Sequence, residues 1–146
     1  LMKQQFMSLN YDLVKAEYTY GDSRIDFYME KNGEKFLTEV KGCTLADDLH
    51  PGIGLFPDAP TERGVKHLHE LTKAAKEGCH TAIAFVIQMN GIHRVLPNEA
   101  AQPEFKKALV EAAKAGVQIV CYSCHVEADR VKITSVTEDT SSYVNM

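Results

Sequence analysis

The strongest structural signal in the sequence is the run RIDFYMEKNGEKFLTEVK, which extends from Arg24 to Lys41. Its central Asn32-Gly33 is the most specific short signal for a β-hairpin with a two-residue turn. The run therefore predicts two antiparallel strands, at residues 24–30 and 35–43. Strict alternation along the first strand places three apolar side chains on one face, namely Ile25, Phe27 and Met29.

Four charged side chains share one face of this predicted hairpin. A two-residue turn sets Asp26 opposite Glu39 and Arg24 opposite Lys41, because side chains repeat every two residues along a strand. Like charges directly opposed destabilise a sheet, so the two carboxylates point to a bound cation. The alternative is a solvated hairpin face on which Arg24 and Lys41 simply neutralise the carboxylates.

A carboxylate pair beside a lysine suits metal-dependent phosphodiester hydrolysis. Mg²⁺ is held in proteins by one or two carboxylates together with water and phosphate oxygens. The metal lowers the pKa of a bound water, and a nearby lysine orients that water or neutralises developing charge. We therefore expect Asp26, Glu39 and Lys41 to be catalytic, with the two carboxylates as ligands of Mg²⁺ or Mn²⁺.

Hydrophobic periodicity predicts the remaining elements. We expect a short helix within residues 1–13, strands at 13–20, 82–89 and 117–122, helices at 62–78 and 103–115, a loop at 44–60, and a polar, mobile tail from about Thr134. Strand, helix and strand in succession indicate a parallel crossover. The fold class is thus α/β, with one mixed sheet in a single domain over residues 1–146 and the order α-β-β-β-α-β-α-β.

Composition excludes several classes of protein. The chain has 146 residues, a net charge of −4 and 45% hydrophobic residues, which is typical of one globular domain. Its longest apolar run is too short to span a bilayer, and no signal peptide is visible. We expect a cytoplasmic protein without a membrane partner. A second copy of the chain is left open as a partner.

The four cysteines offer a competing interpretation. Cys121 and Cys124 form a C-x-x-C, whereas Cys43 and Cys79 stand alone. A structural zinc site needs four ligands, usually from two such motifs, so no zinc is expected. A redox pair remains an alternative to packed free thiols.

A basic stripe is predicted along the helix at 62–78. Lys66, His69, Lys73 and Lys76 are spaced by three and four residues, beside an apolar stripe of Val65, Leu68, Thr72 and Ala75. Such a stripe binds phosphates even in a chain of negative net charge. We expect DNA contacts at Arg24, Arg63, Lys66, His69 and Lys73. The alternative is an ordinary solvated helix face, balanced by Glu70 and Glu77.

The loop that enters this helix has two readings. Asp58 or Thr61 is suited to cap the helix, because either side-chain oxygen accepts from free N–H groups of the first turn. The loop follows the strand that carries Glu39 and Lys41, so Asp58 is equally a candidate metal ligand.

Several motifs resemble the sugar fermentation stimulation protein A family. They are Gly21-Asp22-Ser23-Arg24-Ile25-Asp26-Phe27, Thr38-Glu39-Val40-Lys41, the proline-rich Leu55-Phe56-Pro57-Asp58-Ala59-Pro60-Thr61-Glu62-Arg63-Gly64, Lys66-His67-Leu68 and Phe85-Val86-Ile87-Gln88. The resemblance extends from about Val14 to about Ile133. Gly42 and Cys43 depart from the residues usual in that family, which affects no expected metal ligand.

The resemblance implies a C-terminal domain similar to the PD-(D/E)xK nuclease fold. Matched to that fold, Asp26 resembles its metal-binding aspartate, Glu39 and Lys41 its E-x-K element, and Glu17 another recurrent acid. It also implies an N-terminal OB-like domain that binds DNA, which this chain is expected to lack.

Two functions are consistent with these residues. The first is a Mg²⁺- or Mn²⁺-dependent DNase that uses Asp26, Glu39 and Lys41, with Asp58 or Glu17 as a further ligand. The second, suggested by the resemblance, is a DNA-binding regulator of sugar (maltose) metabolism genes that does not cut. Loss of Lys41 separates them, because it should abolish cleavage and only slightly weaken binding.

Overall fold

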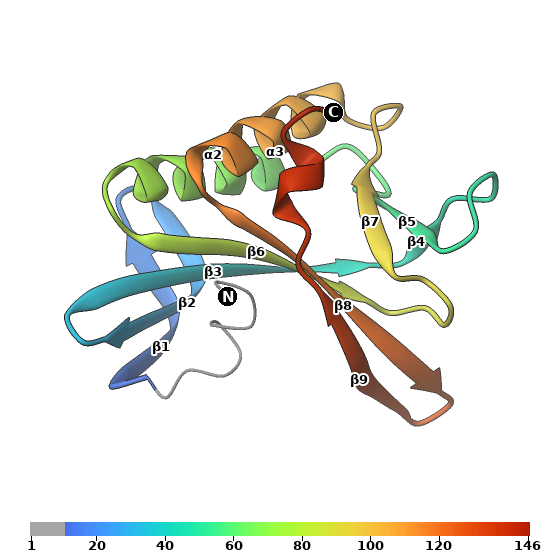
Figure 1. Cartoon of the computed structure of the whole chain (residues 1–146), viewed down its shortest axis with the longest axis horizontal. Helices are drawn as coiled ribbons and strands as arrows, with labels where there is room; N and C mark the ends of the chain where they lie inside the picture. The colour runs from blue at the N-terminus through green and yellow to red at the C-terminus, as the bar shows by residue number, and fades with distance from the viewer. Residues whose placement is uncertain (1–10) are drawn as a thin grey trace.

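A computed structural model describes residues 11–146, and its centre is a twisted sheet of six strands (Figure 1). The strand order is β1-β2-β3-β6-β8-β9. β3, β6 and β8 are mutually parallel, whereas β1, β2 and β9 pair antiparallel. The strands are β1 Leu13–Tyr20, β2 Ser23–Lys31, β3 Glu34–Cys43, β6 His80–Ile87, β8 Gln118–Glu127 and β9 Arg130–Thr137.

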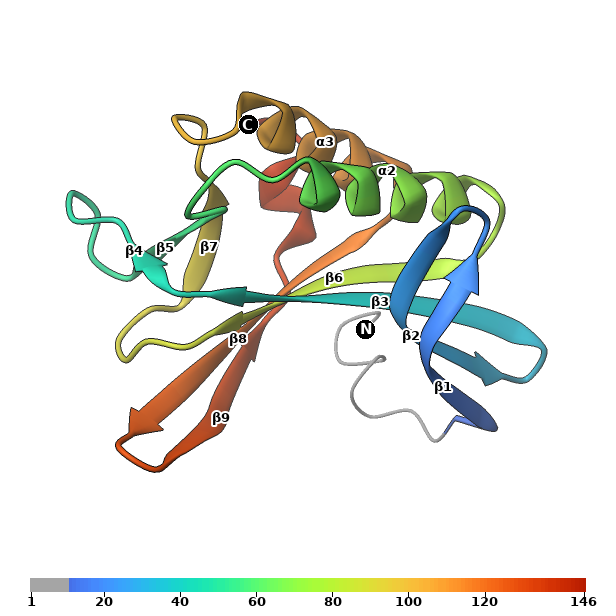
Figure 2. The same ribbon diagram turned by 180° about the vertical axis from the view of Figure 1, so that it is seen from behind.

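Two helices cover one face of this sheet. Helix α2 (Glu62–Lys76) directly precedes β6, and α3 (Pro103–Ala115) lies on the path from β6 to β8. The helices pack side by side above the sheet in both Figure 1 and Figure 2. The parallel β6–α3–β8 crossover predicted from the sequence is confirmed.

The main core lies between the helices and the sheet. Leu68 and Leu71 of α2 and Leu109 of α3 are fully buried against Ile83 and Phe85 of β6. Burying each such side chain contributes roughly 1.5–3 kcal/mol. This packing fixes α2 over β3, where the charged residues lie.

The hairpin register predicted from Asn32-Gly33 is confirmed. Asn32 and Gly33 have φ values of 52° and 80°, as a two-residue turn with both residues left-handed requires. Pairing extends from Lys31 and Glu34 at the turn to Phe27 and Thr38. Asp26 and Glu39 are the next positions in this register, immediately beyond the last paired residues, so the predicted pairs Asp26–Glu39 and Arg24–Lys41 are not part of the ladder.

Strict alternation along β2 is wrong at one point. Ile25 belongs to the core under the helices, although Phe27 and Met29 line the opposite face. The change occurs at Asp26, where the β2–β3 ladder stops and the strand departs from regular pleating. A local break of this kind has no signal in the hydrophobic pattern.

A second sheet was missed in the sequence. Its three strands are β4 (Leu45–Ala46), β5 (Ile53–Phe56) and β7 (Arg94–Pro97) in the order β4-β5-β7. The predicted loop at 44–60 therefore contains two short strands, which project from the body in Figure 2. Strands of two to four residues are too short to produce a measurable alternation.

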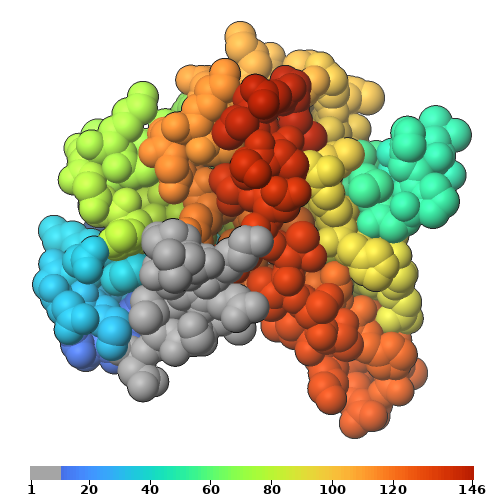
Figure 3. Space-filling view, in the orientation of Figure 1, coloured from blue at the N-terminus to red at the C-terminus, as the bar shows by residue number. Residues whose placement is uncertain are grey.

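The mobile tail predicted from about Thr134 is also wrong. Residues 130–137 form β9, and a 3₁₀ helix, η1, follows at Thr140–Tyr143. Tyr143 is buried, and its hydroxyl donates to the Val95 carbonyl oxygen at 2.6 Å. The β8–β9 hairpin stands out from the body in the space-filling view (Figure 3). One aromatic anchor in a polar segment thus orders the C-terminal residues.

The predicted first helix falls mainly on residues outside the described range. Leu13, its last residue, begins β1 instead. The succession of three strands, helix, strand, helix and strand is present from there on, with β4, β5, β7 and β9 added. The order predicted from the sequence is therefore incomplete.

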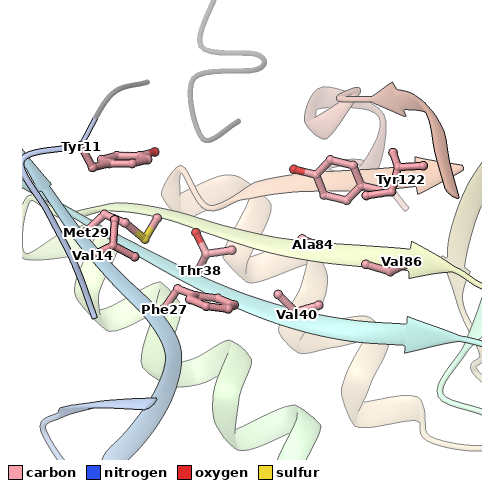
Figure 4. Close-up of a pocket in the computed structure, with 10 residues that line it drawn as sticks. Tyr11, Val14, Phe27, Met29, Thr38, Val40, Ala84, Val86 and Tyr122 are labelled. Carbon is pink, nitrogen blue, oxygen red and sulfur yellow. The ribbon is translucent and has the colours of Figure 1, made fainter. Parts of the chain in front are cut away.

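The sheet face opposite α2 and α3 carries an apolar hollow of about 290 Å³. Side chains from β1, β2, β3, β6 and β8 point into it (Figure 4). Val40, Ala84 and Tyr122 lie on this face, whereas Glu39 and Lys41 lie on the helix face. The apolar hollow and the charged site are thus on opposite sides of the same strands.

Candidate metal and nucleic-acid site

Asp26 occupies the end of the β2–β3 ladder. Its Oδ2 accepts the backbone N–H of Val40 at 2.7 Å. The carboxylate therefore takes the place of a ladder hydrogen bond and is fixed between the two strands. Asp26 is half-buried, so one carboxylate oxygen is held by the backbone while the group keeps some access to solvent.

Glu39 is the most deeply buried acidic side chain of the site. The residue is 1% exposed, and its Oε2 has no hydrogen-bond partner among the described residues. Burial, followed by the hydrogen bond and the charge of Asp26, raises the pKa of Glu39 to about 8. Lys41 and Arg63 act against this shift. The protonated form of Glu39 is therefore favoured at pH 7.

Lys41 projects from β3 toward helix α2, two residues after Glu39. Its Nζ lies 2.9 Å from Nδ1 of His67. Burial lowers the pKa of Lys41, and the negative charges of Glu39 and Asp26 oppose that change. Three of the predicted site residues, Asp26, Glu39 and Lys41, are thus brought together as expected.

His67 is a site residue that the sequence analysis missed. It is 6% exposed on α2, and its Nδ1 lies 3.5 Å from Oε1 of Glu39 as well as close to Lys41. Burial lowers its pKa to about 4, and the positive charges of Lys41 and Arg63 act in the same direction. The imidazole is therefore neutral at pH 7.

The predicted buried stripe of α2 is rotated slightly from the observed one. Leu68 and Thr72 are buried as expected, and so are Gly64, His67, Leu71 and Ala74. A stripe drawn through positions 64, 67, 71 and 74 has helical spacing and would have found His67. The signal was present, but a polar residue on an apolar stripe was not counted.

Glu17 and Arg24 form an ion pair at the edge of the sheet. Their side chains meet at 3.3 Å, and both are mostly exposed. Glu17 has a φ of 53°, an uncommon conformation for a residue other than glycine, at the β1 position facing Asp26. Arg24 therefore does not neutralise Asp26 and Glu39 here, but pairs with a third carboxylate.

The loop before α2 shows which of the two candidate residues, Asp58 or Thr61, caps the helix. Thr61 is the N-cap of α2, and its Oγ1 accepts the N–H of Gly64 at 2.9 Å. Asp58 is exposed earlier in the loop and does not serve as the cap. Its role as a metal ligand stays a prediction.

The basic residues of α2 share an exposed face. Arg63, Lys66, His69, Lys73 and Lys76 are all exposed. Arg63, in the first turn, is close enough to influence the pKa values of Glu39, Lys41 and His67. The predicted DNA-contacting stripe therefore begins beside the carboxylate pair.

The donor set at Asp26 and Glu39 fits a divalent cation. A buried carboxylate oxygen without a partner costs free energy, which a cation contact would offset. The proton retained by this pair is what a metal displaces on binding. Among residues 11–146 there is no group of three or more His, Cys, Asp and Glu side chains arranged around one metal position. Asp26 and Glu39 are thus the two candidate ligands that the fold brings together, and metal binding by these residues, Asp58 or Glu17 stays a prediction.

All four cysteines are free thiols. Cys121 and Cys124 are buried, and their Sγ atoms lie near the hydroxyl of Tyr143 and the carbonyl oxygen of Tyr122 respectively. Burial raises the pKa values of both thiols. Both side chains are therefore neutral thiols that pack in the interior of the fold.

The profile of the sugar fermentation stimulation protein RE domain (SfsA) matches residues 1–130. The chain belongs to this family. It is 44% identical over 132 residues to a sugar fermentation stimulation protein homolog of Desulfitobacterium hafniense strain Y51, and 43% identical over 126 residues to one of Clostridium botulinum strain Langeland. These matches cover 90% and 86% of this chain, but 56% and 54% of the relatives. The chain thus spans about half the length of these SfsA relatives.

A solved SfsA structure has the same fold. SfsA of Pyrococcus furiosus, determined in complex with Ca²⁺, is 27% identical and superimposes with a TM-score of 0.73. The match covers 86% of this chain and 51% of the archaeal one. The mixed α/β arrangement is therefore that of the SfsA family. No helix in residues 11–146 has the length and apolar character needed to cross a membrane.

Proposed function

We propose that this SfsA-family chain is a DNA-binding, metal-dependent nuclease domain of PD-(D/E)xK type. The observation that carries the proposal is the pair of carboxyl groups of half-buried Asp26 and buried Glu39, with Lys41 two residues after Glu39. The strand hairpin, the E-x-K sequence on β3 and the adjoining parallel β6 support it. That the P. furiosus relative was solved with Ca²⁺ supports a divalent cation as cofactor.

Asp26 and Glu39 would hold Mg²⁺ or Mn²⁺. When bound, the metal supplies an activated water and stabilises charge on the scissile phosphate. The hydrogen bond from the Val40 amide already fixes the Asp26 carboxylate, so the side chain needs no further ordering for its second oxygen to contact the metal. On metal binding Glu39 would give up its proton, and its buried Oε2, which has no hydrogen-bond partner among the described residues, would be available as a ligand.

Lys41 supplies the positive charge beside this pair. A lysine ammonium has three N–H donors, so it can contact a phosphate oxygen and orient the attacking water. Its half-buried position strengthens these contacts relative to bulk water. We assign Lys41 this role in the hydrolysis step.

The exposed basic face of α2 would bind the DNA backbone. Arg63, Lys66, His69 and Lys73 lie on the helix that carries His67 into the site. Contacts of this kind are electrostatic and independent of sequence. A phosphate bound near Arg63 would thus be close to Lys41. The cytoplasmic location and any self-association stay predictions.

The test is cleavage of linear and plasmid DNA by the full chain in Mg²⁺, Mn²⁺ or a chelator. The wild type should cut with either metal, and Lys41→Ala should lose cleavage while DNA binding weakens only slightly. Lys107→Ala, on the exposed side of α3, is the charge-matched control and should cut normally. A folded chain that binds neither metal at millimolar concentration would refute the proposal.

The exposed basic face also supports a second function, a DNA-binding regulator that does not cut. That function needs Arg63, Lys66 and Lys73 but not Lys41. Salt-sensitive DNA binding by the wild type, without cleavage in either metal and unchanged in Lys41→Ala, would favour it. If the chain bound no DNA even at low salt, both functions would fail.

A further inference from the structure

We propose that His67 is a positioning residue that holds the Lys41 ammonium in place beside the carboxyl pair. The consequence for catalysis rests on the proposed nuclease function, whereas the contact itself stands on the geometry. Nothing in the E-x-K pattern of β3 requires a histidine from a separate helix. His67 reaches the site because α2 packs over β3.

The contact is short and buried. Nδ1 of His67 lies 2.9 Å from Nζ of Lys41, and the His67 residue is 6% exposed. A protonated lysine amine only donates hydrogen bonds, so Nδ1 accepts and the ring proton is on Nε2. In this tautomer Nδ1 has no proton to offer Oε1 of Glu39 at 3.5 Å. The histidine therefore accepts a hydrogen bond from Lys41 and donates none to Glu39 through Nδ1.

The helix makes His67 a rigid support. Leu68 and Leu71, which follow it, are fully buried, and Thr61 caps the helix two turns before. A free lysine side chain loses rotamer entropy when it is fixed in one position. A contact already present in the folded chain removes most of that cost from the binding of DNA.

One N–H of Lys41 is used by His67, and two remain. Glu39 and Asp26 are near enough for their charges to oppose the fall in the Lys41 pKa that burial causes. We infer that the two remaining donors are available to a phosphate or water bound at the carboxyl pair.

The test compares three substitutions of His67. Asparagine carries its amide oxygen on the same Cγ that bears Nδ1, so His67→Asn keeps an acceptor near that position. His67→Gln moves the acceptor by one carbon, and His67→Leu removes it while filling similar space. His93→Leu, at an exposed position before β7, is the matched control for loss of an imidazole. Thermal unfolding of each variant identifies the folded ones.

The first readout is independent of activity. ¹⁵N NMR of the lysine side chains should show a slowly exchanging Nζ signal that disappears in Lys41→Ala, which assigns it. We expect this signal to persist in His67→Asn and His93→Leu and to be lost in His67→Leu and His67→Gln. An unchanged Lys41 signal in folded His67→Leu would overturn the positioning role.

The second readout is Mn²⁺-dependent cleavage. His67→Leu should lower kcat by about 10²-fold with little change in KM, the loss expected when a catalytic group is misplaced by about 1 Å. His67→Asn should recover most of this loss. Equal losses in folded His67→Asn and His67→Leu would contradict positioning. Absence of cleavage in the wild type would refute the nuclease function, but the NMR comparison would still decide the role of His67.

Discussion

The backbone amide of Val40 donates to Oδ2 of Asp26 at 2.7 Å, at the point where β2 and β3 stop pairing. A side-chain carboxylate thus completes the edge of the ladder and is fixed next to Glu39. This relationship explains how two acids are held together inside the fold. A backbone N–H donor stabilises the Asp26 carboxylate. Glu39 retains a proton, which avoids repulsion between two negative charges.

Replacing Asp26 by asparagine should separate these two effects. The amide oxygen of Asp26→Asn still accepts from Val40, but the like charge beside Glu39 is gone. We expect the pKa of Glu39 to fall from about 8, and cleavage to drop by about 10²–10³-fold through loss of a metal ligand. Carboxyl NMR titration and Mn²⁺ titration measure the two changes.

Asp129→Asn, in the exposed β8–β9 turn, is the matched control and should leave both quantities unchanged. If Asp26→Asn left the Glu39 titration where it is in the wild type, the coupling of the two acids would be wrong.

The stability of the metal-free chain should fall as pH rises from 6.5 to 8. The pKa of Glu39 is raised from 4.5 to about 8, so in this range the folded chain binds a proton that the unfolded chain has lost. His67 has the opposite effect, because its pKa is lowered from 6.5 to about 4, but its contribution is confined to pH below 6.5.

The contribution of Glu39 is measured by urea denaturation of the wild type and Glu39→Gln. Their difference in free energy of unfolding should change with a slope of up to about 1.4 kcal/mol per pH unit. Saturating Mn²⁺ should reduce this slope, because the metal replaces the proton. Parallel pH profiles for the two proteins would rule out the raised pKa.

Thr61→Ala should destabilise the chain by about 1 kcal/mol through loss of the α2 cap. Asp58→Ala, three residues earlier and exposed, is the control and should change the free energy of unfolding by less than about 0.5 kcal/mol. Equilibrium urea denaturation compares them. Equal destabilisation would mean that Asp58 shares the capping role.

A lower Mn²⁺ affinity in Asp58→Ala would support the predicted role of Asp58 as a metal ligand.

Removing Lys66 and Lys73 together should weaken DNA binding and its salt dependence. Each lost phosphate contact lowers the slope of log affinity against log salt by about 0.9, so the double alanine variant should lose about 2 units. The matched control is the pair Lys106 and Lys107 on α3. Fluorescence anisotropy at several salt concentrations gives the slopes, and equal slopes for the two double variants would argue against α2 as the DNA-binding face.

The hairpin was predictable because its signals are local. Asn32-Gly33 defined the turn, and the register then placed Asp26 beside Glu39. The long helices were equally clear, because their periodicity extends over 13 to 15 residues. In each case the chain segment itself contains the information.

Features that depend on contacts between distant segments were not predictable in the same way. His67 reaches Lys41 only because α2 packs on β3. A lone histidine on an apolar stripe is usually an ordinary core residue, so the sequence pattern alone did not mark His67 as part of a site. Tyr143 orders the C-terminal residues through Val95, 48 positions earlier. The hairpin register and the family resemblance both indicated Asp26, Glu39 and Lys41, but neither indicated that Glu39 would be buried.

The most direct test of the metal site is anomalous diffraction from crystals of this chain soaked in Mn²⁺. We expect a peak between the carboxyl groups of Asp26 and Glu39, with Lys41 still in contact with His67. The absence of a peak there, with Lys41 or Arg24 folded onto both carboxylates, would refute the metal site.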